Sequence, residues 1–277
     1  MRYPTVRECV DVFDSLWPPD LAEDWDTVGL AVGDPDAEVR SILLALDPTD
    51  AVIAEAVVLG ADLLFTHHPL LLRGVTSVSA GSLKGGAVHT LITNGIAQFN
   101  AHTNADAALG GVSDVLIALT GVTESQPLVP DPDGSGRGIG RVGDLGEART
   151  VRDIARTLAE RLPPTTTGVR IGGDPAAEVT RVAVCGGAGD SLFDAVRASG
   201  ADVYITADLR HHPATEALDT ANRGQARPQL IDVSHWASES VWLAAARDAL
   251  DAAFAARGLS VALQSSAVNT DPWVERY

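Results

Sequence analysis

Residues 60–66 read GADLLFT, and residues 200–206 read GADVYIT. In each copy the glycine suits the end of a helix, because glycine adopts the left-handed conformation there without strain. The apolar residues after the aspartate form a short continuous run, which predicts a strand buried on both faces. Both copies are followed by His-His-Pro, directly at residues 67–69 and after a four-residue spacer at residues 211–213. The chain therefore carries two similar segments.

Each copy completes a predicted strand–helix–strand unit. Apolar strands joined by a helix form a parallel or mixed sheet covered by helices. We therefore predict an α/β fold with two similar α/β domains related by internal duplication, each built on a mostly parallel or mixed sheet. The predicted units consist of strand 41–46, helix 50–59 and strand 62–66 in the first half, and strand 181–185, helix 190–199 and strand 202–206 in the second.

The duplication extends downstream. A predicted strand at residues 96–101 is followed by His102 and Asp106, and one at residues 229–234 is followed by His235 and Glu239. In each pair the acid comes four residues after the histidine. We align the two pairs with one another.

The segment 129–145 concentrates Pro, Gly and Asp, which is typical of loops and turns, so we place a domain crossing near residues 123–140. If the histidines and acids that follow the strands of both halves share one metal site, residues 1–122 and 235–277 form a metal-binding domain. Residues 123–234 are then an inserted second domain.

The composition excludes several classes of function. The net charge is 20 − 37 = −17, which disfavours binding to nucleic acid or to anionic membranes. The two cysteines, Cys9 and Cys185, cannot build a disulfide framework or an all-thiolate zinc site. We find no signal peptide and no apolar run of about 18 residues, and we expect a cytoplasmic protein without a membrane span.

His67 and His68 are the strongest candidates for a functional site, because they follow a predicted buried strand. Ligands of open α/β sheets bind beyond the carboxyl ends of the strands. Two adjacent imidazoles there are either metal ligands or hydrogen-bonded loop residues. The pairs His102/Asp106 and His235/Glu239, which also follow strands, favour the metal. A set of nitrogen and oxygen ligands suits zinc, manganese, iron(II), cobalt or nickel and does not choose among them.

The remaining candidates are weaker. His211 and His212 are displaced from the strand end by the spacer, so we interpret them as facing the substrate at best and otherwise as surface residues. His89 lies in a predicted helix and is expected to be structural. The run Gly186-Gly187-Ala188-Gly189 has no dinucleotide or P-loop pattern, so we interpret it as a close turn that lines a pocket. Cys185 has no activating basic neighbour in the sequence.

The chain resembles a known family, the Ngg-interacting-factor-like proteins, which are called GTP cyclohydrolase I type 2 homologues in bacteria. The resemblance spans residues 5–273. The matching motifs are WDTVGL at 25–30, THHPL at 66–70, HTNAD at 102–106, GIGRVG at 138–143, DVYIT at 202–206, HWASE at 235–239 and NTDPW at 269–273.

The resemblance implies two divalent metal ions per subunit. It also implies a hexamer, built as a trimer of dimers, with the sites facing an internal cavity. His102 falls within a family motif and is expected to orient a ligand. The implied metal ligands are His67, His68, Asp106, His235 and Glu239.

Three departures from the family pattern leave every ligand in place. Thr27 stands where the family usually has Asn, and Ala207 stands where it favours Gly. Trp236 and Ser238 change the motif around Glu239. The changes at Trp236 and Ser238 bear on the shape of the pocket and hence on the substrate.

Two functions from different classes remain open. The first is a metal-dependent hydrolase acting on a nucleotide: GTP cyclohydrolase chemistry opens the guanine imidazole ring at C8 and releases formate. Metal-activated water would attack, and His102 or His212 would carry protons. The second is a non-catalytic protein that stores, delivers or senses a metal. Turnover of GTP by the metal-loaded protein separates the two.

Overall fold

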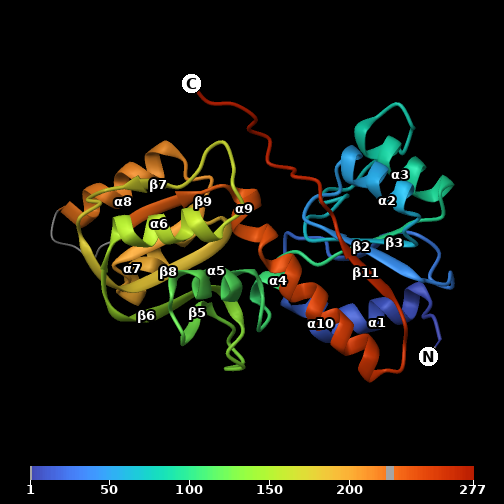
Figure 1. The fold of residues 1–277 in the computed structure, drawn as a ribbon, viewed down its shortest axis with the longest axis horizontal. Helices are drawn as coiled ribbons and strands as arrows, with labels where there is room; N and C mark the ends of the chain where they lie inside the picture. The colour runs from blue at the N-terminus through green and yellow to red at the C-terminus, as the bar shows by residue number, and fades with distance from the viewer. Residues whose placement is uncertain (1, 223–227) are drawn as a thin grey trace. The chain divides into compact units, whose positions relative to one another are not determined.

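The computed structural model describes residues 2–222 and 228–277 (Figure 1). The chain divides into two compact units. The first comprises Met1–Ala108 and Leu243–Thr270, and the second comprises Leu109–Trp242 and Asp271–Tyr277. Within the described residues, no helix has the length and apolar character needed to cross a membrane.

The boundaries between the units lie at 108/109 and 242/243, whereas the expected boundaries were 122/123 and 234/235. The second unit starts earlier because helix α5 (Val112–Thr120) packs with Leu116 and Ile117 into that unit's core. It ends later because helix α9 (His235–Ser240) packs Ala237 into the same core. His235 and Glu239 therefore belong to the second unit.

The first unit has a five-stranded sheet in the order β1-β4-β3-β2-β11. The four neighbours β4, β3, β2 and β11 are parallel, and β1 is antiparallel to β4. The sheet is therefore mixed and mostly parallel, as predicted. Its strands are β1 (Gly29–Val32), β2 (Ser41–Ala45), β3 (Leu63–Thr66), β4 (Ala97–Asn100) and β11 (Ala262–Ser265).

Alternate residues of β3 face opposite sides of this sheet. Leu64 packs in a core with α2 and α3. Phe65 packs instead against Phe13 of α1, which also contacts Phe254 of α10. Figure 1 shows these two pairs of helices on opposite faces of the sheet. The helices of the unit are α1 (Val6–Leu16), η1 (Pro19–Leu21), α2 (Asp50–Leu59), α3 (Leu83–Thr93), α4 (Thr103–Ala107) and α10 (Trp242–Ala256).

The second unit has a six-stranded sheet in the order β5-β6-β8-β9-β10-β7, in which β8, β9 and β10 are parallel. One apolar cluster, which includes Ile154 and Leu158 of α6, covers one face, and another, which includes Phe193 and Val196 of α7, covers the other. The strands are β5 (Ser125–Pro130), β6 (Gly138–Thr150), β7 (Arg170–Gly172), β8 (Glu178–Ala188), β9 (Val203–Ala207) and β10 (Gln229–Val233). Besides α5 and α9, the helices are α6 (Val151–Arg161), η2 (Asp190–Leu192), α7 (Phe193–Ser199) and α8 (His211–Asn222).

The segment expected to be a loop, 129–145, is largely an antiparallel hairpin of β5 and β6. The glycines within β6 permit close contact between backbones rather than an irregular turn. A Cβ at Gly138 would lie 2.1 Å from the Val129 carbonyl oxygen, and one at Gly143 would lie 2.4 Å from the Glu124 carbonyl oxygen. The loop expectation was therefore wrong for most of this segment.

The internal repeat is visible in individual hydrogen bonds. Asp62 accepts from the backbone N–H groups of Arg40 and Ser41, at 2.8 and 3.0 Å. Asp202 accepts in the same way from Thr180 and Arg181, at 2.9 and 3.0 Å. The repeated aspartate therefore clamps the start of the neighbouring strand in both units.

The sheet register corrects one alignment made from the sequence. In the two units, Thr66 pairs with Asn100 and Thr206 pairs with Asp232. Counting two residues onward, His102 is equivalent to Ser234 rather than to His235. Each of the two equivalent residues is the N-cap of the helix that follows.

Candidate metal centre

His67 and His68 leave the carboxyl end of β3 with their backbone still held by the neighbouring strand. The His67 N–H donates to the Ala45 carbonyl at 3.2 Å, and the His68 N–H donates to the Leu46 carbonyl at 2.9 Å. His67 is fully buried, whereas the His68 side chain is 20% exposed. The strand ladder thus fixes the directions in which both imidazoles leave the sheet.

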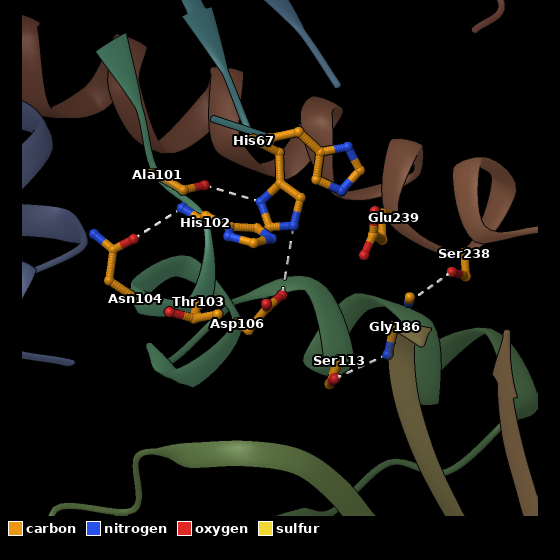
Figure 2. A network of polar contacts seen from close by, with 12 residues as sticks. His67, Ala101, His102, Thr103, Asn104, Asp106, Ser113, Gly186, Ser238 and Glu239 are labelled. Carbon is orange, nitrogen blue, oxygen red and sulfur yellow. Dashed lines mark hydrogen bonds and ion pairs between the residues drawn. The ribbon is translucent and has the colours of Figure 1, made fainter. Parts of the chain in front are cut away.

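The His67 ring is oriented by a backbone carbonyl. Its Nδ1 lies 2.9 Å from the Ala101 carbonyl oxygen (Figure 2). A carbonyl can only accept, so Nδ1 must carry the hydrogen and Nε2 has the lone pair in the neutral ring. Nε2 faces the Asp106 carboxylate, with 3.7 Å to Oδ1. This is the tautomer that binds a metal through Nε2.

The other two imidazoles of this unit are held at Nδ1 by carboxylates. His68 Nδ1 lies 2.6 Å from Asp47 Oδ1, and His102 Nδ1 lies 2.9 Å from Asp26 Oδ1. Metal-binding histidines are typically oriented through their second ring nitrogen in this way. All three rings therefore present Nε2 in the same manner.

His67, His68 and His102 form one cluster. Each offers a nitrogen within 4.8 Å of those of the other two. The ring centroid of His67 lies 5.1 Å from that of His68 and 5.2 Å from that of His102. His102, expected only to orient a ligand, thus has the geometry of a ligand itself.

Asp26 anchors His102 and the start of α4 together. Its side chain is inaccessible to solvent, and its Oδ2 accepts from the Thr103 backbone N–H and hydroxyl at 3.0 and 2.6 Å. Burial acts to raise the pKa of this carboxyl, but the hydrogen bonds from His102 and Thr103 outweigh it and hold the pKa well below its usual range. A fixed negative charge therefore stands behind His102.

The second unit contains a separate pair, His235 and Glu239, which lie one turn apart on α9. Their Nε2 and Oε2 atoms are 3.2 Å apart, and the Glu239 side chain is only 4% exposed. His235 Nδ1 lies 2.7 Å from Asp208 Oδ2. Burial acts to lower the pKa of His235, but the two carboxylates outweigh it and raise the pKa to about 11.

Asp208 holds His235 from a strained backbone position. Its φ of 54° makes it the only non-glycine residue with positive φ in the part of the chain that the structure describes. Such strain tends to persist where the side chain has a specific task. The task visible here is to receive the His235 ring.

The glycine run 186–189 was expected to form a close turn that lines a pocket. In the structure, Gly187 of this run packs against His235 and Glu239. Gly187 has φ +64°, and a Cβ placed on it would lie 2.2 Å from Glu239 Oε1 and 3.1 Å from His235 Nε2. The Gly187 N–H donates to Ser238 Oγ at 3.0 Å, and the neighbouring Gly186 N–H donates to Ser113 Oγ at 3.3 Å (Figure 2). The absence of a side chain at Gly187 leaves room for the carboxylate of Glu239.

The remaining histidines lie elsewhere. His211 and His212 are exposed at the start of α8, with their rings 5.3 Å apart. Neither belongs to a group of three or more metal-ligating side chains among the described residues. His89 is exposed on α3. The expected role of His212 in proton transfer stays a prediction.

Reasoning from the sequence missed the carboxylates that orient the rings, Asp26, Asp47 and Asp208. A signal existed for two of them. Asp47 follows the predicted strand 41–46, and Asp26 lies in the WDTVGL motif. Asp208 gave no signal, because its backbone conformation is set by tertiary structure.

Substitutions of Asp208 distinguish the effect of its strained backbone on stability from its effect on the orientation of the His235 ring. We expect Asp208→Gly to weaken metal binding about 10- to 100-fold, because His235 loses the acceptor that orients it. The free energy of unfolding should change by less than about 1 kcal/mol, since relief of strain and the flexibility of glycine oppose one another.

Metal titration and chemical denaturation of the Asp208 variants measure these two effects. Asp208→Asn is the matched control: it keeps an acceptor and tolerates positive φ, so its loss of affinity should be smaller. Equal affinity in wild type and Asp208→Gly would rule out the positioning role.

Comparison with known proteins identifies the family. The model of the family Duf34/NIF3 (NGG1p interacting factor 3) matches residues 4–272. A protein of Streptomyces coelicolor named GTP cyclohydrolase 1 type 2 homolog is 50% identical over 272 residues, which cover 98% of this chain and 94% of the relative. A protein of Clostridium perfringens with the same name is 33% identical over 84% of this chain and 86% of its own length.

Solved structures share the fold over nearly the whole chain. A Bacillus cereus protein related to NIF3 has a TM-score of 0.89 at 24% identity and covers 99% of this chain and 100% of its own. Reduced HcgD from Methanocaldococcus jannaschii has a TM-score of 0.76 at 26% identity and covers 96% of this chain and 98% of its own. The chain therefore belongs to the Duf34/NIF3 (NGG1p interacting factor 3) family.

Proposed function

We propose that the protein is a metal-dependent hydrolase that acts on a nucleotide. The observation that carries the proposal is the orientation of four imidazoles. His67, His68, His102 and His235 each have Nδ1 beside an oxygen acceptor, which presents Nε2 to a ligand. Solvated surface histidines do not need such orientation, whereas a metal site does.

The donor set fits divalent transition metals. It consists of imidazole nitrogens and carboxylate oxygens, which suit zinc, manganese, iron(II), cobalt or nickel. We propose two ions per subunit. When bound, such a pair supplies Lewis-acid activation of water. The residues that would hold the ions are His67, His68, Asp106, His235 and Glu239.

We further propose that both ligand sets serve the same pair of ions. Each unit brings one carboxylate to its set, Asp106 or Glu239, so a separate divalent ion in either unit would be incompletely neutralised. A shared pair would have both carboxylates. The test is a double-mutant cycle of His67→Ala and Glu239→Gln read by metal content. A shared site predicts strongly non-additive losses, and two separate sites predict additive ones.

His102 is assigned to proton transfer. Asp26 fixes its Nδ1, so its Nε2 would be the atom that takes up and returns the proton. In His102→Ala, we expect turnover to fall while both metals stay bound. Loss of a metal ion instead would make His102 a ligand, as its place in the cluster permits.

Trp25 offers a surface for a planar base. It is 60% exposed, and its ring centroid lies 5.8 Å from that of His102 in an edge-to-face arrangement. Stacking of a base on an aromatic side chain is worth about 1–3 kcal/mol. We therefore expect Trp25→Ala to raise KM for a nucleotide about 5- to 150-fold, with a much smaller change in Trp25→Phe. Equal KM in wild type and both variants would exclude this surface.

The decisive experiment is turnover by the metal-loaded protein. Purified protein reconstituted with each candidate metal is incubated with GTP, and formate release is measured alongside metal content. Release that disappears in Asp106→Asn supports the hydrolase. Stoichiometric metal without turnover of GTP or of a panel of other nucleotides would favour storage, delivery or sensing of the metal.

Metal binding should weaken as the pH falls. An imidazole must be deprotonated to bind, and in the metal-free protein the raised pKa of His235, about 11, keeps that ring charged at neutral pH. Binding therefore expels protons, and affinity should fall by up to about tenfold per pH unit for each proton released. Competition titrations at pH 8, 7 and 6 measure this. Equal affinity across that range would contradict a histidine-rich site.

We also propose a hexamer built as a trimer of dimers, an assembly that the family resemblance implies. The mass of one chain is 28.8 kDa. Light scattering at micromolar concentration should give six times this mass. A monomer mass would refute the proposal.

A further inference from the structure

We propose that Thr270 and Asp271, near the end of the chain, are positioning residues for the metal ligands of both units. Thr270 fixes the carboxylate that holds His68. Asp271 fixes the serine that caps the helix carrying His235 and Glu239. The inference rests on the proposed binding of metal by these ligands.

The segment before Thr270 is firmly anchored in the first unit. Strand β11 pairs in parallel with β2, and the Ser266 N–H donates to the Leu44 carbonyl at 2.7 Å. Glu55 of α2 accepts from the Ser266 hydroxyl and from the Ala267 N–H. Val268 packs against the apolar core beneath α2 and α3. These contacts fix the backbone up to residue 268 and thereby restrict the position of Thr270.

Thr270 acts on His68 through Asp47. The Thr270 hydroxyl donates to Asp47 Oδ2, and the other carboxylate oxygen, Oδ1, lies 2.6 Å from His68 Nδ1. The carboxylate is thus held at both oxygens. Without the hydroxyl the Oδ2 atom loses this donor, and the acceptor that sets the plane and tautomer of the imidazole is held less firmly.

Asp271 acts on α9 through Ser234. The Ser234 hydroxyl donates to Asp271 Oδ2, and the same oxygen accepts from the Ala237 N–H at 3.2 Å as the N-cap of α9. Asp271 is itself fixed by the Trp273 N–H, which donates to Oδ1 at 2.9 Å. Because the hydroxyl hydrogen points to Asp271, the lone pairs of the oxygen point to the helix.

This cap matters because α9 is short. The helix has six residues and includes both His235 and Glu239. Loss of an N-cap weakens the first turn, where His235 lies. The chain passes from the first unit to the second at the bond between Thr270 and Asp271. Two consecutive residues therefore act on the two ligand sets, although neither is a ligand.

The role of Thr270 is tested by measuring the affinity for cobalt(II) and the visible absorption of the bound ion, which reports its ligand field. Cobalt(II) is titrated into the full-length protein, and its dissociation constant and visible absorption are recorded. We expect Thr270→Val, which keeps the shape and removes the hydroxyl, to bind cobalt about 10- to 100-fold more weakly with an altered spectrum. Thr270→Ser should restore both. Thr93→Val is the matched control, because Thr93 donates only to backbone carbonyls within α3.

The test for Asp271 is independent of the first. Asp271→Asn keeps the size of the side chain and removes its charge, and we expect it to weaken cobalt binding about tenfold. Amide hydrogen exchange should quicken at residues 235–239 and stay unchanged in α6. A merely structural role would lower the melting temperature without changing the cobalt spectrum of the folded protein.

The outcomes separate this inference from the proposed function. If the wild-type protein binds no cobalt, the proposed metal site fails and the inference with it. If the wild type binds and Thr270→Val and Asp271→Asn bind equally well with the wild-type spectrum, the inference alone is overturned. Should Thr270→Val not fold, Thr270→Ala takes its place in the same comparison.

Discussion

Protein with His67 replaced by alanine is expected to lose most of its bound metal and keep its fold. Metal binding at a structural four-ligand site is worth about 10–16 kcal/mol, so one ligand accounts for about 3 kcal/mol, or roughly a 100-fold loss of affinity. His67 is fully buried, and its removal leaves a small cavity and the Ala101 carbonyl without its donor. We expect a loss of about 1–3 kcal/mol in the free energy of unfolding.

His89→Ala is the matched control for this prediction. His89 is exposed on α3, so the same substitution there should change neither metal content nor stability. Elemental analysis after dialysis gives the metal content, and chemical denaturation gives the free energy of unfolding. Metal content equal to wild type in folded His67→Ala would remove His67 from the site.

The elements that apolar runs define could be predicted closely from the sequence. The predicted helix 50–59 is α2, and the predicted strand 41–46 is β2 with one further residue. The strand is buried between the layers of helices that cover the sheet, which explains its continuous apolar run. The helix buries Val52, Ile53 and Ala56 against the same core. Strand β6 was missed because its glycines suggest a turn, whereas Gly138, Gly140 and Gly143 each allow a close approach of the neighbouring backbone.

The candidate ligands could be predicted because they follow predicted strands. His67 and His68 follow β3, and His235 follows β10 after one residue. The alignment of His102 with His235 failed by one residue because spacing along the chain does not show which residue caps the next helix. Only the sheet register revealed it.

The partners of the groups that orient the ligands could not be assigned from the sequence. Asp47 and Asp208 are two of many aspartates in an acidic chain, and each acts across a long separation in sequence, on His68 and His235. A single carboxylate in a loop carries no periodic signal. Its role follows from a hydrogen bond that exists only in the folded protein.

Gly187→Ala is expected to abolish the contribution of Glu239 to metal binding while the protein stays folded. The added Cβ would lie 2.2 Å from Glu239 Oε1, far inside contact distance. The atom it meets is the end of a flexible side chain, so the carboxylate moves and the backbone stays. Displacing one carboxylate ligand should lower metal affinity about 100-fold, by the same reasoning as for one imidazole.

Gly200→Ala separates this displacement from backbone strain. Both glycines have positive φ, +64° at Gly187 and +72° at Gly200, but a Cβ at Gly200 meets no atom within 4 Å. The left-handed conformation costs a residue with a side chain about 1–2 kcal/mol. Both variants should therefore lose similar stability by chemical denaturation, and only Gly187→Ala should lose metal by elemental analysis. Retention of metal in both would mean that the position of the Glu239 carboxylate does not matter to binding.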